Sequence, residues 1–140
     1  MSFQAAEGLS INWPHPMHLP NTVILVVEDE ILIRMDIVDQ LAARDYHVLE
    51  ACNATAALEA IAAVDKIDVL FTDIDMPGDM DGVQLALTVS RSRPGIAIVV
   101  CSGKADISVG DLPKRTRVCA KPCDPDALHL VIQDLVGTAG

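Results

Sequence analysis

Acidic side chains stand directly after two apolar runs of the chain. Glu28 and Asp29 follow the run 23–27, Asp73 follows a second such run, and Asp75 comes two residues later. In an open parallel sheet, ligands bind outside the carboxyl ends of the strands. Carboxylates packed there repel one another, and a hard divalent cation with oxygen ligands relieves this repulsion, Mg²⁺ being preferred beside phosphate. The acidic residues therefore predict a magnesium site.

A hydroxyl and an amine follow two further apolar runs. Ser102 comes after the run 96–101, and Lys121 comes after the run 117–120. A metal and a lysine beside an aspartate can neutralise charge on a transferring phosphoryl group, so Asp73 is a candidate nucleophile that would form an aspartyl phosphate. Together these residue types predict phosphoryl transfer.

A parallel sheet would bring these side chains together. From Thr22 onward, short β-branched runs alternate with helical stretches, the pattern of βαβ units in which both faces of the sheet are covered. The predicted fold class is α/β, with a doubly wound five-stranded parallel sheet. The strands are expected at 23–27, 48–51, 69–72, 96–101 and 117–120.

Four helices have clear signals and one has a weak signal. Helical spacing relates Ile31, Met35, Val38 and Ala42 in the first. Caps or periodicity place two others at 54–64 after Asn53 and at 83–90 after the turn and cap signal Asp81-Gly82. The last runs from Pro125 after Asp124 to an end at Gly137, with the stripe Leu128, Val131, Ile132 and Leu135. The stretch 105–112 is a poor helix because it contains Gly110 and precedes Pro113. Ile33, Ile37 and Leu41 lie off the first helix's stripe, so we expect them either to form a partner surface or to pack against the last helix.

Composition narrows the class of protein. The 140 residues suit one domain, and 51% hydrophobic residues suffice for a core. The formal charge of −10 argues against nucleic-acid binding. No apolar run is long enough to span a membrane and no signal peptide is recognisable, so the cytoplasm is the expected compartment. The four cysteines have no Cys-x-x-Cys spacing, which favours buried free thiols over a zinc site.

At this point the sequence resembles a known family, the response regulator receiver domain with its CheY-like fold. The resemblance covers residues 21–136 and rests on four motifs in order: Val-Ile-Leu-Val-Val-Glu-Asp-Glu at 23–30, Phe-Thr-Asp-Ile-Asp-Met-Pro-Gly at 71–78, Val-Val-Cys-Ser-Gly at 99–103, and Lys-Pro at 121–122. It implies a flavodoxin-like (βα)5 fold with strand order 2-1-3-4-5. It also implies a response regulator of two-component signal transduction.

The resemblance implies a role for each site residue. Asp73 would accept a phosphoryl group from a sensor histidine kinase or a histidine phosphotransfer protein, and the domain would catalyse its own phosphorylation and its slow dephosphorylation. Asp29, Asp73 and the backbone carbonyl of Asp75 would hold Mg²⁺, with Glu28 assisting through metal-bound water. Lys121 would pair with the phosphoryl oxygens. Ser102 would turn its hydroxyl toward them, and a cis bond would join Lys121 to Pro122.

One position departs from the family pattern. The family usually has Tyr or Phe three residues before the lysine, but this chain has Val118. Valine has one stiff torsion and no ring to move between a pocket and the surface. We therefore expect the stretch 105–112, with Gly103 and Gly110 as hinges, to reorder on phosphorylation.

The sequence leaves two alternative functions open, and the segments at the two ends of the chain carry expectations of their own. A haloacid-dehalogenase-like phosphatase also uses an Asp-x-Asp pair after a strand, and a pseudo-receiver adaptor would keep the fold without the chemistry. The apolar arm 1–20, which contains Trp13, is expected to pack on its own domain or on a second subunit of a homodimer. Since only the short tail 138–140 follows the receiver domain 21–137, output is expected through another protein.

Overall fold

The computed structural model describes residues 22–103 and 112–139. Strands and helices alternate in the order β2 (Val23–Val27), α1 (Ile31–Ala42), β3 (His47–Ala51), α2 (Ala54–Ala63), β4 (Val69–Asp73), α3 (Gly82–Ser92), β5 (Ala97–Ser102), β6 (Thr116–Ala120) and α4 (Pro125–Ala139). The expected arm 1–20 and nearly all of the weak helix 105–112 lie outside the described residues. Packing of the arm, a homodimer contact and reordering of 105–112 therefore stay predictions.

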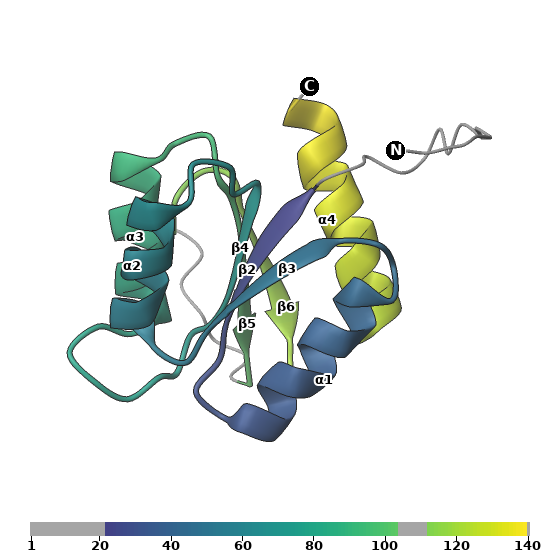
Figure 1. Ribbon diagram of the computed structural model, residues 1–140, viewed down its shortest axis with the longest axis horizontal. Helices are drawn as coiled ribbons and strands as arrows, with labels where there is room; N and C mark the ends of the chain where they lie inside the picture. Colours follow the sequence, from purple (N-terminus) through teal and green to yellow (C-terminus); the bar gives the residue numbers. More distant parts are fainter. Residues whose placement is uncertain (1–21, 104–111, 140) are drawn as a thin grey trace.

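The five strands form one parallel sheet with the order β3-β2-β4-β5-β6 (Figure 1). With the five strands counted along the chain from β2, this order is 2-1-3-4-5, which confirms the predicted doubly wound α/β fold. Every residue of β2, β4 and β5 is buried, which explains why these strands are continuous apolar runs in the sequence. Because the strands are parallel, their carboxyl ends meet at one edge of the sheet.

Helices cover both faces of the sheet (Figure 1), with α2 and α3 on one side and α1 and α4 on the other. Successive strand side chains point to opposite faces. Leu25 and Leu70 therefore pack in the core beneath α2 and α3, whereas Val26 and Phe71 pack in the core beneath α1 and α4. Within the described ranges, no helix combines the length and the apolar character needed to cross a membrane.

Side-chain caps begin three of the helices, as the sequence predicted. Asn53 Oδ1 accepts a hydrogen bond from the Ala56 amide at 2.8 Å at the start of α2. Asp81 and Gln84 form a reciprocal capping box on α3, and Asp124 caps α4. The predicted end of the last helix at Gly137 is wrong, because α4 continues to Ala139. One glycine costs a helix only about 1 kcal/mol relative to alanine, which does not force it to end.

The predicted orientation of α1 is also wrong. Ile37 and Leu41 are buried, and Ile33 is 37% exposed, whereas Ile31 and Met35 are 58% and 51% exposed. Apolar residues surround the first half of this helix, so spacing alone does not determine which stripe faces the sheet. Ile37 and Leu41 share a core with the inner face of α4. Of the two expectations, packing against the last helix is confirmed for Ile37 and Leu41, for which a partner surface is excluded. For the exposed Ile33, both expectations stay open.

Candidate phosphoryl-transfer site

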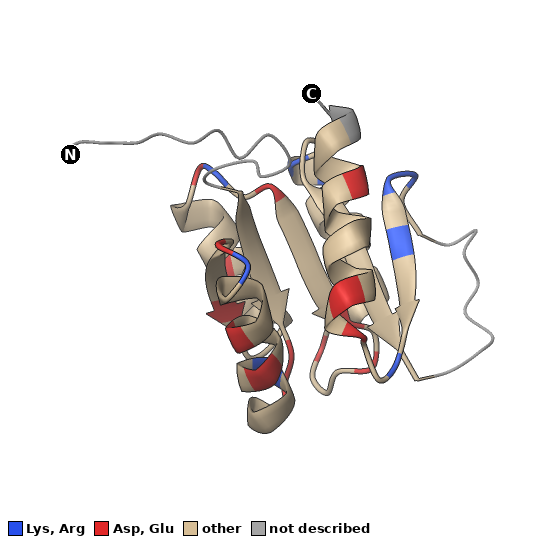
Figure 2. Cartoon of the chain, turned by 90° about the vertical axis from the view of Figure 1, so that its right-hand side faces the viewer, with Lys and Arg blue, Asp and Glu red and all other residues tan. Residues whose placement is uncertain are grey.

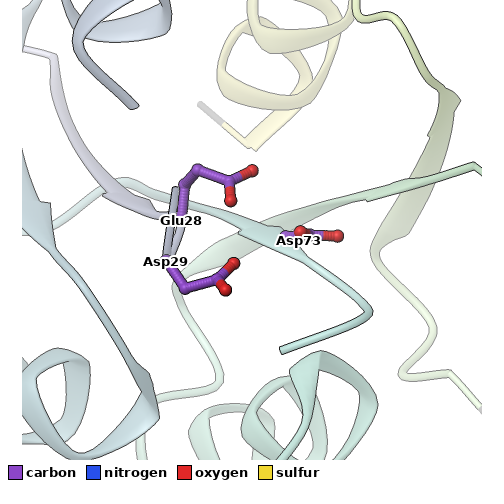
Figure 3. A group of neighbouring side chains, drawn as sticks. All are labelled: Glu28, Asp29 and Asp73. Atoms are coloured by element: carbon purple, nitrogen blue, oxygen red, sulfur yellow. The ribbon is translucent and has the colours of Figure 1, made fainter. Parts of the chain in front are cut away.

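Three carboxylates meet at the carboxyl edge of the sheet. Glu28 and Asp29 directly follow β2, Asp73 is the last residue of β4, and each offers an oxygen atom within 4.8 Å of the others (Figure 3). Glu28 and Asp73 are buried, whereas Asp29 is exposed. In Figure 2, red acidic segments lie at this end of the sheet, beyond the strand arrowheads. The sequence-predicted acids therefore lie close enough to share one cation.

Burial and neighbouring acids make Glu28 hard to ionise. Burial raises the pKa of Glu28 to about 7, and the Asp29 side chain and the charge of Asp73 act in the same direction. The Glu30 amide, which donates to Glu28 Oε2 at 3.0 Å, and the charge of Lys121 oppose this rise. The raised pKa of Glu28 therefore partly reflects repulsion among the acids of the cluster. A hard divalent cation would relieve this repulsion, and carboxylate oxygens are the ligands that such a cation prefers.

Lys121 pairs directly with the central acid. Its Nζ lies 2.9 Å from Asp73 Oδ2, and the side chain of Asp73 is only 4% exposed. Burial alone would lower the pKa of Lys121, but the hydrogen bond and charge of Asp73, helped by Glu28, outweigh it and raise the pKa. Lys121 is therefore cationic at neutral pH. The bond between Lys121 and Pro122 is cis, which confirms the expectation from the family resemblance.

Backbone hydrogen bonds hold the remaining site residues in place. Ser102 is the buried last residue of β5, and its carbonyl accepts a hydrogen bond from the Lys121 amide at 2.9 Å. The Asp75 amide donates to Asp73 Oδ1 at 3.1 Å, while the Asp75 residue itself is exposed. Each oxygen of Asp73 thus has one donor, which fixes the orientation of the carboxylate.

Three residues support the site in ways that the sequence interpretation did not predict. Arg34 Nη1 donates to the Glu28 carbonyl at 2.8 Å, and the buried Thr72 hydroxyl donates to the Asp73 carbonyl at 2.9 Å. At Gly82, an added Cβ would lie 2.1 Å from the Asp73 carbonyl oxygen. The Asp-Gly pair was visible as a helix-start signal, but its close approach to a distant strand has no local signature.

An apolar surface lies next to the site. The first turn of α1 exposes Ile31, Leu32 and Met35, and Leu32 is 76% exposed. Beside this turn is a pocket of about 510 Å³. Its charged lining residues are Glu28, Asp36 and Lys121. The other lining residues are apolar: Leu32, Ile33, Ile37, Phe71, Cys101, Pro122 and Cys123. On β6, Val118 is 40% exposed and occupies the position where the family usually has an aromatic ring.

Comparison with known proteins identifies the same combination of fold and motifs. Residues 24–133 match the family model of the response regulator receiver domain. The response regulator receiver protein CpdR of Brucella abortus (strain 2308) is 32% identical over 102 residues, which cover 71% of this chain and 83% of CpdR. The sensor kinase CckA of the same organism is 33% identical over 105 residues, or 67% of this chain, but the chain spans only 11% of CckA.

A solved structure shows the same fold. The response regulator TrrA from Thermotoga maritima, in complex with Mg²⁺-BeF, superimposes with a TM-score of 0.71 at 24% identity, covering 81% of this chain and 98% of TrrA.

Proposed function

The chain belongs to the response regulator receiver domain family of two-component signalling proteins, and from this premise we propose that Asp73 accepts a phosphoryl group from a phosphohistidine. The contact between Lys121 Nζ and Asp73 Oδ2 is the observation that carries the proposal. Of the three carboxylates, Asp73 is thereby the one paired with a cation, and this cation can also neutralise the negative charge of an incoming phosphoryl group. The donor would be a sensor histidine kinase or a histidine phosphotransfer protein.

The transfer uses groups already in place. An oxygen of Asp73 attacks the phosphorus, the P–O bond forms as the P–N bond of the donor breaks, and the leaving imidazole takes up a proton. Lys121 moves its hydrogen bonds from the carboxylate to the phosphoryl oxygens, and the Ser102 hydroxyl donates to another of them. The domain itself thereby promotes its phosphorylation and the slow hydrolysis that reverses it.

The acidic cluster suits a resident Mg²⁺ ion. Asp29, Asp73 and the backbone carbonyl of Asp75 would bind it directly, and Glu28 would bind through an ordered water. When bound, Mg²⁺ supplies positive charge to the phosphoryl oxygens and relieves repulsion among the carboxylates. Asp29 and Glu28 then act by holding the ion, while Asp73 remains the only nucleophile.

We assign donor docking to the exposed first turn of α1. Ile31, Leu32 and Met35 form an apolar surface beside the site, and charged residues adjoin them in the chain, as at many protein interfaces. The output would also be a protein contact, because the net charge of −10 disfavours nucleic acid. Free thiols suit a reducing compartment, which supports the cytoplasm as the location.

The two alternative functions are not favoured. A phosphatase with an Asp-x-Asp pair needs its second carboxylate at the reacting centre, but Asp75 is exposed and its backbone amide donates to Asp73 Oδ1. A pseudo-receiver adaptor has no need of the partly buried Lys121–Asp73 ion pair, since burying the Asp73 carboxylate costs free energy.

Phosphorylation by a small donor tests the function directly. The full chain is incubated with phosphoramidate and Mg²⁺, and intact-mass spectrometry measures addition of one phosphoryl group. We expect Asp73→Asn to abolish the addition and Asp79→Asn, which changes an exposed acid in the loop after β4, to leave it unchanged. Equal phosphorylation of Asp73→Asn and the unmodified protein would refute the assignment, and continuous release of phosphate from a phosphate ester would instead favour the phosphatase.

A further inference from the structure

Three of the four cysteines gather beside Lys121. Cys101 on β5 and Cys119 on β6 are register partners on neighbouring strands, and Cys123 lies in the loop that joins β6 to α4. All three pack in the core beneath α1 and α4, and all are free thiols. The proposed phosphoryl transfer uses none of them, so their proximity calls for a separate explanation.

Cys123 is the centre of this thiol cluster. Its thiol lies close enough to those of Cys101 and Cys119 for both to perturb its ionisation. In the described part of the chain, only the three site carboxylates form a group whose ligand atoms all lie within 4.8 Å of one another. The thiols therefore do not make a preformed metal site with three ligands, and their arrangement favours chemistry between pairs.

The pair Cys119 and Cys123 has the better access. Cys101 is 3% exposed, whereas the other two are partly exposed, and Cys123 borders the pocket beside Lys121. The neighbouring Cys123 thiol lowers the pKa of Cys119 to about 7 against the opposing effect of burial. The other two thiols, together with burial, raise the pKa of Cys123, which stays protonated. Since the thiolate is the reactive form of cysteine, Cys119 is the nucleophile of the pair.

We propose that a hydroperoxide converts Cys119 and Cys123 into a reversible disulfide, which makes this pair a modification site. Sγ of Cys119 attacks the peroxide; an S–O bond forms, the O–O bond breaks, and the released hydroxide takes up the proton that the Cys119 thiol had lost. The Cys123 thiol then attacks the same sulfur; the S–S bond forms, the S–O bond breaks, and water leaves with the thiol proton. Two thiols and one hydrogen peroxide give one disulfide and two waters.

The disulfide would act on the neighbouring site. It closes a ring over residues 119–123 that contains Lys121, whose Nζ contacts Asp73 and whose amide donates to the Ser102 carbonyl. This consequence rests on the proposed function. We expect the oxidised protein to accept phosphate at least about tenfold more slowly, the ratio for loss of one charge-assisted hydrogen bond.

Peptide mapping of the full chain tests the disulfide without any phosphorylation assay. The reduced protein is treated with hydrogen peroxide, remaining thiols are blocked with N-ethylmaleimide, and the protein is digested with trypsin. Because trypsin does not cleave before Pro122, Cys119 and Cys123 stay in one peptide, 118–140, while Cys101 lies in the peptide 92–104. We expect two of the four thiols to resist the blocking reagent and peptide 118–140 to lose the mass of two hydrogens, reversibly with dithiothreitol.

Single substitutions assign the partners. Cys119→Ser and Cys123→Ser should abolish the mass loss, whereas Cys101→Ser and the distant, exposed Cys52→Ser should retain it. Four unprotected thiols after peroxide treatment, or a crosslink between peptides 92–104 and 118–140, would overturn the proposal, and both results are obtained from the unmodified sequence. A mapped disulfide with an unchanged phosphorylation rate would refute the effect on Lys121 alone. Failure of the reduced protein to accept phosphate would refute the proposed function and leave the mapping result intact.

Discussion

Replacing Gly82 with alanine tests how closely α3 must approach the end of β4. An added Cβ at this position would lie 2.1 Å from the Asp73 carbonyl oxygen, 2.7 Å from the Ile74 Cα and 2.9 Å from the Asp73 carbonyl carbon. All three neighbours are backbone atoms, so no side chain can rotate away. Ordinary contact begins at 3.4 Å, and the helix or the loop must therefore move by more than 1 Å.

Two effects of opposite sign decide the result. Alanine is a better helix former than glycine by about 1 kcal/mol in a helix interior, and by less at the first turn. Forcing extra volume into a packed site typically costs about 1–3 kcal/mol. Gly82 does not have a positive φ, so the cost comes from contact with Asp73 and Ile74 alone. We expect a net loss of roughly 1–3 kcal/mol in the free energy of unfolding.

Urea denaturation followed by far-ultraviolet circular dichroism measures this loss. Gly137→Ala is the matched control, because Gly137 lies in α4 and has nothing within 4 Å of an added Cβ. The control should be neutral or stabilised by up to about 1 kcal/mol. Gly82→Ala should also accept phosphate more slowly, since the displaced backbone carries Asp73. Equal stability of Gly82→Ala and Gly137→Ala would refute the proposed close approach.

Three further predictions follow from burial and charge. Asp29→Asn should weaken Mg²⁺ binding roughly tenfold or more in a calorimetric titration, yet leave metal-free stability unchanged or higher because it removes repulsion; a marked loss of metal-free stability would contradict this. Because the pKa of Glu28 is raised from 4.5 to about 7, its stabilising contribution is complete below pH 4.5 and is lost as the pH rises through 7. The stability of the metal-free protein should therefore fall over that window, Mg²⁺ should stabilise the protein more above pH 7, and Glu28→Gln should flatten both trends. Leu41→Ala should cost about 2–5 kcal/mol in urea denaturation and Ile33→Ala under about 1 kcal/mol, whereas the reverse order would restore the orientation of α1 predicted from its spacing.

The strands and the site residues that end them were predictable because their signals are local. A strand buried on both faces must be a continuous apolar run, so Val23–Val27 was located to the residue and the acids after it were placed at the carboxyl edge. Once the strands are known to be parallel, Asp73 and Lys121 must lie at the same end of the sheet. The caps of α2, α3 and α4 were likewise readable, because each depends on hydrogen bonds within a few residues.

Features that depend on how the elements pack in three dimensions were not predictable. The buried stripe of α1 is decided by the sheet and by α4, since apolar residues occupy several faces of its first half. The role of Gly82 depends on the path of β4, and that of Arg34 on the carbonyl of Glu28. The expectation of buried free thiols was correct about their free state, but Cys52 is exposed and the clustering of the others depends on the register of β5 and β6.

Hydrogen bonds beyond the strand ends explain why the site keeps its geometry. The Ile74 amide donates to the Cys101 carbonyl at 3.0 Å, and the Lys121 amide donates to the Ser102 carbonyl at 2.9 Å. Each bond continues the ladder of the sheet one step past the last residue of a strand. The Cα atoms of Asp73, Ser102 and Lys121 are therefore held by the sheet, whereas their side-chain torsions can change. Since Val118 has no ring to move with them, we expect a change at Ser102 on phosphorylation to reach a partner through the backbone that follows it.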